Sequence, residues 1–350
     1  MTVNEMPIIW ISLGVVSLIA STDQIAPSNP MGLLAAALTV AAIGALAWAV
    51  IAAVRSRSVP MWALDVALPD GWRTSTDSPS VGRVVRGALL PFIPDRRGLA
   101  KVEHHRYGPD RRHRLQVFRR RDASAGVPIL IHFHGGRFRG GDAGRDSLPL
   151  MRSLARRGWV CVSATYRLGD AGAFPASVVD AKRVLAWTRD HAHALGVDPT
   201  RVVVAGSSAG AHLAMFVALT PGQPSYQPGF ESADVSVSAA VGLYGYYGPR
   251  TSEPISSPAQ HATAAAPPIF VLHGDHDSIV PVDWARGFAQ QMQRVSHHPV
   301  AYAELPGAQH TFDMFSSVRA EAVAVAVERF SNWAVGAGRV LTKGPEPVTD

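Results

Sequence analysis

The stretch RVVVAGSSAGAHLAMFVAL, Arg201–Leu219, decides the fold of this chain. It joins a β-branched run at Val202–Val204 to a Gly-Ser-Ser-Ala-Gly corner and then to an apolar segment of helical composition. The corner places Ser208 in a G-x-S-x-G frame, which is typical of a nucleophile elbow between a strand and a helix. Gly206 and Gly210 leave room where a Cβ would push strand and helix apart. The pattern predicts that Ser208 is a nucleophile; an ordinary glycine-rich turn is the alternative.

Composition limits the remaining possibilities. Of the 350 residues, 47% are hydrophobic and 17% are charged, and the apolar excess lies near the N-terminus. The single cysteine, Cys161, rules out an intrachain disulfide and fits a reducing compartment. A net charge of +6 favours an anionic partner, either nucleic acid or the inner leaflet of a membrane. No nucleic-acid reader module accompanies this charge, so we expect no nucleic-acid binding.

Two apolar segments precede the rest of the chain, and we predict that residues 1–58 form a transmembrane helical hairpin. The second segment, Met31–Val54, has 24 residues without charge, roughly 36 Å of helix against a ~30 Å hydrocarbon layer. The first segment, at 6–22, is shorter, and Ser21–Pro30 forms the loop between the two. A cleavable signal peptide is the alternative for the first segment. Glu5 and the lack of Lys or Arg before the apolar run disfavour it.

Positive charge begins after the second segment, at Arg55 and Arg57, and eleven arginines follow between 83 and 121. Because positive charge stays on the inner side, we expect two spans in the cell membrane and a cytoplasmic catalytic domain. Residues 59–94 are predicted to be a juxtamembrane connector, with an amphipathic stretch at 82–91. Arginines of the basic segment 83–121 would bind anionic headgroups, at about 1 kcal/mol each close to the surface. A solvated basic face is the alternative.

Residues 95–335 are predicted to form one α/β domain, and 336–350 a C-terminal tail. Two strands around a Gly-Pro-Asp turn, 101–107 and 114–120, indicate a leading hairpin. Strands then alternate with helices, which implies a mainly parallel sheet covered on both faces. Apart from the elbow strand and helix, the expected strands are 127–134, 158–166, 235–243, 268–272 and 299–305, and the expected helices are 148–157, 177–195, 282–294 and 317–334.

A serine hydroxyl needs a base within hydrogen-bond reach to act as a nucleophile. In this architecture the acid and the histidine follow the serine, in loops at the carboxyl ends of later strands. His310 lies in PGAQHTF, directly after one such strand, and is the predicted base. The acid lies in HGDHDSIVP after the preceding strand, where Asp275 and Asp277 compete and Asp277 is favoured. Asp313, one helical turn from His310, is too local to orient its ring.

A third element, HFHGGRF, follows the strand that begins at residue 127. Backbone N–H groups of Gly135 and Gly136, with that of Ala209, are predicted to form an oxyanion hole; a simple Gly-Gly turn is the alternative. Losing one such donor typically lowers the rate about 10²–10³-fold. No further cluster of metal ligands accompanies His132 and His134. We therefore expect no metal and no cofactor.

Together, these motifs resemble those of the α/β-hydrolase superfamily, and within it the hormone-sensitive-lipase-like carboxylesterases. The layout, with its apolar N-terminus, is also similar to that of membrane-associated esterases of actinobacteria. The resemblance implies Ser208 as nucleophile, His310 as general base and then acid, and Asp277 as the orienting carboxylate. It also implies the oxyanion hole already described. Six stretches carry the resemblance: HGGRF at 134–138, YRL at 166–168, FPASVVDAKRVLAW at 174–187, GSSAG at 206–210, HGDHDSIVP at 273–281 and PGAQHTF at 306–312.

One departure concerns the substrate pocket. Many members of the family have a third glycine where this chain has Arg137, so Arg137 and Phe138 are predicted to shape the pocket. Arg137 would favour substrates with a carboxylate or phosphate; a solvent-facing arginine is the alternative. We expect a membrane-anchored serine hydrolase of small-molecule or lipid carboxylic esters. An amidase or peptidase with the same triad, and a non-catalytic membrane-tethered binding module, are the alternatives. The sequence specifies neither the acyl and alcohol groups nor the oligomeric state.

Overall fold

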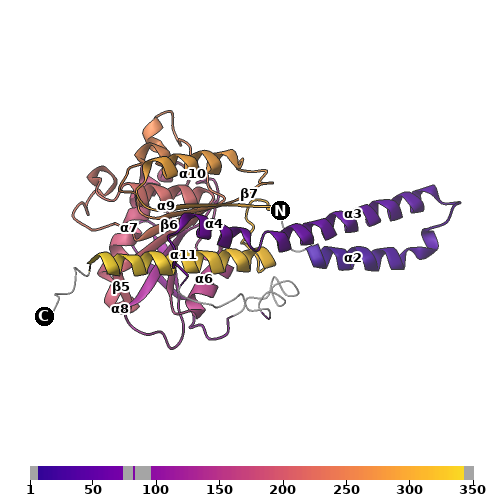
Figure 1. Ribbon diagram of the computed structural model, residues 1–350, viewed down its shortest axis with the longest axis horizontal. Helices are drawn as coiled ribbons and strands as arrows, with labels where there is room; N and C mark the ends of the chain where they lie inside the picture. The colour runs from indigo at the N-terminus through magenta and orange to yellow at the C-terminus, as the bar shows by residue number, and fades with distance from the viewer. Residues whose placement is uncertain (1–6, 74–81, 83–95, 343–350) are drawn as a thin grey trace.

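The computed structural model describes residues 7–73, 82 and 96–342. It consists of an α/β body and a pair of helices that projects from it (Figure 1). Much of the connector predicted at 59–94 lies outside the described residues. So do the amphipathic stretch at 82–91, apart from residue 82, and the first part of the basic segment 83–121.

The body is built on one eight-stranded sheet. Its strands are β1 Glu103–Arg106, β2 Arg114–Phe118, β3 Val127–Phe133, β4 Val160–Ala164, β5 Val197–Ser207, β6 Ala239–Leu243, β7 Ile269–Gly274 and β8 Val300–Leu305. The strand order is β1-β2-β4-β3-β5-β6-β7-β8. The β1–β2 and β2–β4 pairs are antiparallel and the other five are parallel. The leading hairpin and the mainly parallel sheet are both confirmed. The carboxyl ends of β3 to β8 therefore meet at one edge.

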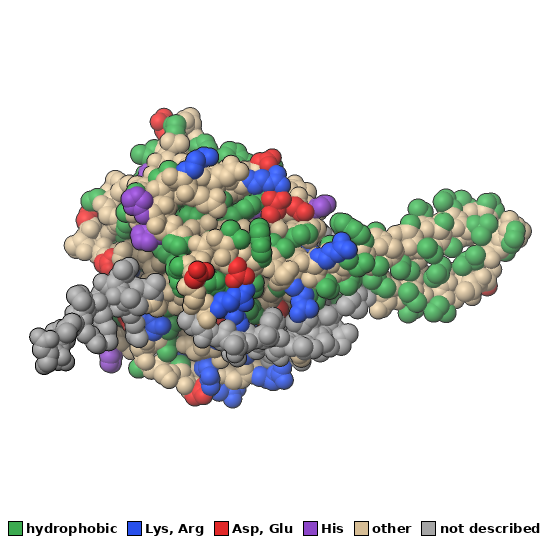
Figure 2. Space-filling view, viewed as in Figure 1, with side chains coloured by type: hydrophobic (Ala, Val, Ile, Leu, Met, Phe, Trp, Pro, Cys, Tyr) green, Lys and Arg blue, Asp and Glu red, His purple; other side chains and the backbone are tan. Residues whose placement is uncertain are grey.

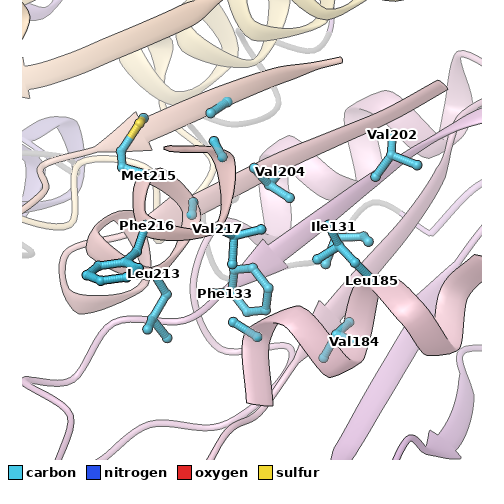
Figure 3. Packing of buried hydrophobic residues seen from close by; sticks show 14 of the residues in the cluster. Ile131, Phe133, Val184, Leu185, Val202, Val204, Leu213, Met215, Phe216 and Val217 are labelled. Carbon is cyan, nitrogen blue, oxygen red and sulfur yellow. The ribbon is translucent and has the colours of Figure 1, made fainter. Parts of the chain in front are cut away.

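Helices cover both faces of the sheet (Figure 1). They are α4 Val59–Ala67, α6 Leu148–Arg156, α7 Ala176–Asp190, α8 Ala192–Leu195, α9 Ala209–Leu219, α10 Asp283–Val295 and α11 Val318–Thr342. Buried side chains of α7, α9 and α10 form one core cluster, and those of α4, α6 and α11 form the other. Figure 3 shows Phe216 and Val217 of α9 in one buried cluster with Ile131 and Phe133 of β3. This packing fixes α9, which begins beside Ser208.

Several element boundaries differ from the prediction. The helix expected at 177–195 breaks at His191 into α7 and α8, and Gly196 ends α8 with a φ of 68° as a left-handed cap. Strand β6 begins at Ala239 rather than at 235. Helix α11 continues to Thr342, into the tail predicted from 336, and the remainder of that tail lies outside the described residues.

The projecting part consists of α2, Pro7–Ala20, and α3, Pro30–Arg55, which lie side by side (Figure 1). The Asn29 side chain caps α3 by accepting the Gly32 N–H at 3.0 Å. Hydrophobic side chains cover the surface of both helices (Figure 2). Among the described helices, one continuous segment, Pro30–Ala67, is long and apolar enough to cross a membrane. Helix α2 has 14 residues, so the first predicted span is not matched by a helix of membrane-crossing length.

The base of α3 docks on the α/β body. Ala52 lies against Gly307, in the loop that follows β8. Arg319 of α11 donates to Ser56 Oγ at 3.3 Å and to the Pro306 carbonyl at 3.1 Å. The end of α3 is thereby fixed to the loop that carries His310.

Candidate active site

Ser208 occupies a sharp turn between β5 and α9. Its φ of 55° and ψ of −115° lie in a region that side-chain-bearing residues rarely adopt. The turn needs glycine on both sides, because a Cβ on Gly206 would overlap the Gly210 carbonyl and one on Gly210 would overlap that of Phe133. The predicted elbow is therefore present, with the Ser208 side chain at the carboxyl edge of the sheet.

The structure brings the three predicted triad residues together. His310 Nε2 lies 3.0 Å from Ser208 Oγ, and His310 Nδ1 lies 2.6 Å from Asp277 Oδ2. All three residues are less than a tenth exposed. A carboxylate only accepts hydrogen bonds, so Nδ1 carries the proton and Nε2 is left to accept from the serine hydroxyl. This is the geometry that a general base requires.

Asp277 is surrounded by donors that favour its ionised form. Oδ1 accepts the N–H groups of Ile279 at 2.8 Å and Val280 at 2.9 Å. Oδ2 also lies 3.2 Å from His273 Nε2. Burial opposes ionisation, but the hydrogen bonds from His273, His310 and Val280 outweigh it and hold the pKa of Asp277 well below its ordinary value. Asp277 is therefore an anion throughout the physiological range.

Asp275, the competing acid, points elsewhere. Its Oδ1 accepts the Gly307 N–H at 2.7 Å and contacts His276 Nδ1 at 2.6 Å. These bonds tie the loop after β7 to the loop after β8. Asp275 therefore orders the two loops that carry Asp277 and His310.

One predicted oxyanion donor needs correction. The Gly135 N–H donates to Asp146 Oδ2 at 2.7 Å, so it is not free to bind a substrate oxygen. Ala209 is the first residue of α9, where a backbone N–H has no intrahelical acceptor. Gly136 and Arg137 have φ values of 122° and 56°, and this unusual backbone turns the peptide after Gly135. The sequence could not reveal the Asp146 bond, which comes from a loop without periodic pattern.

Ser208 opens into a cleft of about 920 Å³. Both predicted pocket residues, Arg137 and Phe138, line it, together with Ala209. Tyr246 and Ile279 add apolar surface from the loops after β6 and β7. The site can thus hold a partly apolar substrate next to the serine.

The two histidines of HFHGGRF have separate partners. His132 Nε2 lies 3.0 Å from Ser207 Oγ, and His134 Nδ1 lies 2.6 Å from the Gly135 carbonyl. The His134 ring stacks on Tyr166 at a centroid distance of 4.6 Å. Burial lowers the pKa of both rings to about 4, so they are neutral at physiological pH. Both rings therefore act as buried structural groups in the strand and turn that lead to Arg137.

A buried polar network behind the elbow was missed by sequence reasoning. Asp313 accepts the hydroxyl of Ser147 and, at 2.6 Å, that of Tyr244, rather than contacting His310. Ser147 Oγ in turn lies 2.9 Å from Ser207 Oγ. Burial raises the pKa of Asp313 to about 6, although the two hydroxyls partly offset this. Two sequence features could have indicated this network: the first serine of GSSAG, Ser207, and the position of Tyr244 directly after β6.

The parallel sheet, with a serine at the β5–α9 elbow and an acid and a histidine after β7 and β8, defines an α/β hydrolase. The BD-FAE family matches residues 115–250. The "Probable carboxylic ester hydrolase LipM" of Mycobacterium tuberculosis is 41% identical over 258 residues, covering 65% of this chain and 59% of LipM. "Esterase LipQ" of the same organism is 37% identical, covering 69% of this chain and 65% of LipQ.

A solved structure agrees with these relatives. The butyrate-bound esterase Est2 of Thermogutta terrifontis is 26% identical, with a TM-score of 0.58, and the match covers 72% of this chain and 98% of Est2. The chain has the α/β-hydrolase fold, contains a BD-FAE domain and is homologous to these esterases. It spans about three fifths of the length of the two curated mycobacterial relatives.

Proposed function

We propose that this chain is a serine hydrolase that cleaves carboxylic esters, with Ser208 as nucleophile, His310 as base and Asp277 as orienting acid. The observation that carries the proposal is the unbroken hydrogen-bonded line from Asp277 through His310 to Ser208, which ends at the cleft. The names of the mycobacterial relatives and of Est2 support an ester as the bond that is cleaved.

The hydrogen bonds indicate the role of each triad residue in the reaction. Ser208 Oγ attacks the ester carbonyl carbon while His310 Nε2 takes its proton. The imidazolium passes that proton to the leaving alcohol, and the acyl group stays on Ser208. Water then attacks the acyl-enzyme, giving its proton to His310, and the carboxylic acid leaves as Ser208 regains its hydrogen. Asp277 holds Nδ1–H throughout and stabilises the imidazolium.

The oxyanion of each tetrahedral intermediate needs donors beside Ser208. We assign them to the backbone N–H groups of Gly136, Arg137 and Ala209, in place of the predicted set that included Gly135. Arg137 and Ala209 line the cleft with Ser208, and the first N–H of α9 also carries the positive end of the helix dipole. Because the donor at 137 is a backbone N–H, it is also present when arginine replaces the glycine that many family members have there.

Hydrolysis of p-nitrophenyl butyrate by the full chain in detergent tests the ester proposal. We expect the S208A variant to lose at least 10³-fold in kcat, as triad knockouts do in other serine hydrolases. Ser207→Ala is the matched control, because the neighbouring serine bonds to His132 and Ser147 instead of His310. A fluorophosphonate probe should label wild type and S207A but not S208A.

Three outcomes would count against the proposal. Equal rates for wild type and S208A would remove Ser208 from the chemistry. Faster cleavage of a matched butyryl anilide than of the ester would favour the amidase alternative. A wild-type chain that neither hydrolyses the ester nor takes up the probe would favour a non-catalytic binding module.

We further propose that α3 anchors the enzyme in the cell membrane, that α2 forms a second span and that the catalytic domain is cytoplasmic. Three residues of α3, Ala49, Ala52 and Ala53, are buried, and all lie near the end that docks on the body. The rest of the helix exposes large apolar side chains such as Leu38, at 63% exposure, which water would not favour. Arg55 and Arg57 follow at the end expected to face the cytoplasm.

Reporter fusions test this topology. A green fluorescent protein after residue 350 should fluoresce and an alkaline phosphatase there should be inactive; the reverse result would contradict a cytoplasmic domain. An N-terminal tag shielded from an impermeant label in intact cells supports two spans, and an accessible tag supports one. The headgroup role of the basic segment 83–121 has less support, because Arg119 and Arg120 pair with Glu103 and Asp122.

A further inference from the structure

The cleft beside Ser208 has an excess of positive charge. Arg137, Arg139 and Arg250 line it, against one lining carboxyl group, that of the exposed Asp170. Within the described ranges 7–73 and 96–342, none of the three guanidinium groups forms an ion pair. Several other arginines around the sheet do pair with acids, as Arg167 does with Asp180 at 2.7 Å. The cleft therefore gathers three cations that no acid among the described residues pairs with.

Arg250 is the best fixed of the three. It donates to Ser177 Oγ at 2.5 Å and to the Gly172 carbonyl at 3.1 Å. Its guanidinium carbon lies 3.6 Å from the centroid of the Phe138 ring, a cation–π contact. All of these partners are neutral, and burial lowers the pKa of Arg250 to about 10, which leaves it a cation at neutral pH. A partly buried cation held rigidly by neutral groups is arranged to receive an anion.

Arg137 and Arg139 add two further cations to the lining of the cleft. Both are exposed, and they flank Phe138 in the turn after β3. An anionic group in the cleft would gain charge-assisted hydrogen bonds from one or more of these arginines, and the walls of the cleft reduce the screening by water. The apolar surface of Tyr246 and Ile279 would bind the remainder of the same molecule.

We infer that the cleft selects esters that carry an anionic group, a carboxylate or a phosphate, in addition to the ester that is cleaved. This inference rests on the proposed ester hydrolysis at Ser208 and names its substrate class. The arginines act on substrate binding, so Arg250 and its two neighbours are specificity residues, while the bond-breaking steps stay with the triad. A neutral ester of equal size is expected to be the poorer substrate.

Matched ester pairs test the inference. On the acyl side, p-nitrophenyl hemisuccinate and hemiglutarate are compared with p-nitrophenyl butyrate and valerate, with S208A as the blank for spontaneous hydrolysis. On the alcohol side, the butyrate esters of 4-hydroxybenzoate and 4-hydroxyphenyl phosphate are compared with phenyl butyrate. We expect kcat/KM for at least one anionic ester to exceed that of its neutral partner tenfold or more. That ratio should fall as salt is added, because exposed charges are screened.

Variants identify the source of the selectivity. The ratio of anionic to neutral kcat/KM should drop about 10-fold in R250Q and several-fold in R137Q and R139Q. Because the ratio is taken within one protein, a variant that folds less well still reports on selectivity, and the exposed Arg139 is the safest site. Arg183→Gln is the matched control, because Arg183 also stacks on a phenylalanine, Phe230, at 4.6 Å but lies outside the cleft.

The outcomes separate the two proposals. A wild-type chain that hydrolyses neutral esters as well as anionic ones, or ratios that are the same in R250Q, R139Q and R183Q, would overturn the inference and leave the ester proposal standing. A wild-type chain that hydrolyses none of the esters above the S208A blank would overturn the proposed function itself.

Discussion

Asp277 and Asp313 are both buried carboxyl groups in the loops that follow the last two strands of the sheet, but their surroundings are opposite. Asp277 accepts two backbone N–H groups and contacts two imidazole rings, which hold its pKa well below the ordinary value. Asp313 accepts hydroxyls from Ser147 and Tyr244, and burial raises its pKa to about 6. The kind and number of donors, and not burial alone, decide which carboxyl group is an anion.

Separation along the sequence does not decide which of the two carboxyl groups contacts His310. Asp313 is three residues from His310, and Asp277 is 33 residues away. Asp277 nevertheless contacts the imidazole, because β7 and β8 are parallel neighbours whose carboxyl ends meet. A permanently charged Asp277 can hold one tautomer of His310, whereas Asp313 can gain or lose its proton near neutral pH. We therefore assign Asp277 to catalysis and Asp313 to the support of the elbow.

The largest expected effect comes from Asp277→Asn. An amide lacks the charge that stabilises the imidazolium, and its NH₂ group favours the wrong tautomer of His310, so kcat should fall about 10⁴-fold, as in a serine protease. Asp313→Asn, a matched change in the other carboxyl group, should lower kcat less than tenfold. The measurement is p-nitrophenyl butyrate hydrolysis by the full chain. Similar losses in D277N and D313N would contradict the division of roles.

The three triad residues could be predicted because each lies in a recognisable local sequence pattern. Ser208 sits in a glycine-framed corner, and both Asp277 and His310 follow apolar strands of a parallel sheet. Such strands end at a common edge, so residues far apart in the chain could be assigned to one site. The cleft residues Arg137 and Phe138 were predicted differently, from the family resemblance of HGGRF and its departure at the third glycine.

Other features depend on contacts that leave no local pattern. The Gly135 N–H is occupied by Asp146, eleven residues further along and in an irregular loop. The base of α3 packs on Gly307, a contact that joins the first and last parts of the chain. Side-chain partners of this kind are set by the packing of the whole fold. The occupation of the Gly135 N–H and the docking of the apolar helices were therefore beyond reach from sequence.

A smaller effect is expected in the pH dependence of stability. Asp313 ionises near pH 3.8 when unfolded and near pH 6 when folded, so the unfolded state loses its proton first. The contribution of Asp313 to the free energy of unfolding therefore falls as pH rises from about 4 to 6. The fall is about 3 kcal/mol, at 1.36 kcal/mol per pKa unit. Asp277 behaves oppositely: its depressed pKa stabilises the fold above about pH 4, and this is lost only as pH falls further.

Between pH 4 and 8, the Asp277 contribution is therefore constant and that of Asp313 changes. We expect wild type to lose about 3 kcal/mol relative to D313N over this range, measured as the difference in free energy of unfolding in urea. Parallel pH curves for wild type and D313N would contradict the raised pKa. A relative loss that instead appears below pH 4 would assign the effect to groups with depressed pKa values, such as Asp277.

The smallest expected effect comes from a single hydroxyl. Tyr244→Phe removes one of the donors to Asp313 but keeps the ring, whose centroid lies 4.7 Å from that of His310. A buried carboxylate that loses a donor should cost about 1–3 kcal/mol of stability, and more above pH 6, where Asp313 is ionised. Tyr247→Phe is the matched control, because the buried Tyr247 hydroxyl has no hydrogen-bond partner among the described residues. Its free energy of unfolding should stay within about 0.5 kcal/mol of wild type or rise slightly, since an unpartnered polar group is removed. If Y244F and Y247F have equal stability at pH 8, the Tyr244 bond does not support the ionised Asp313.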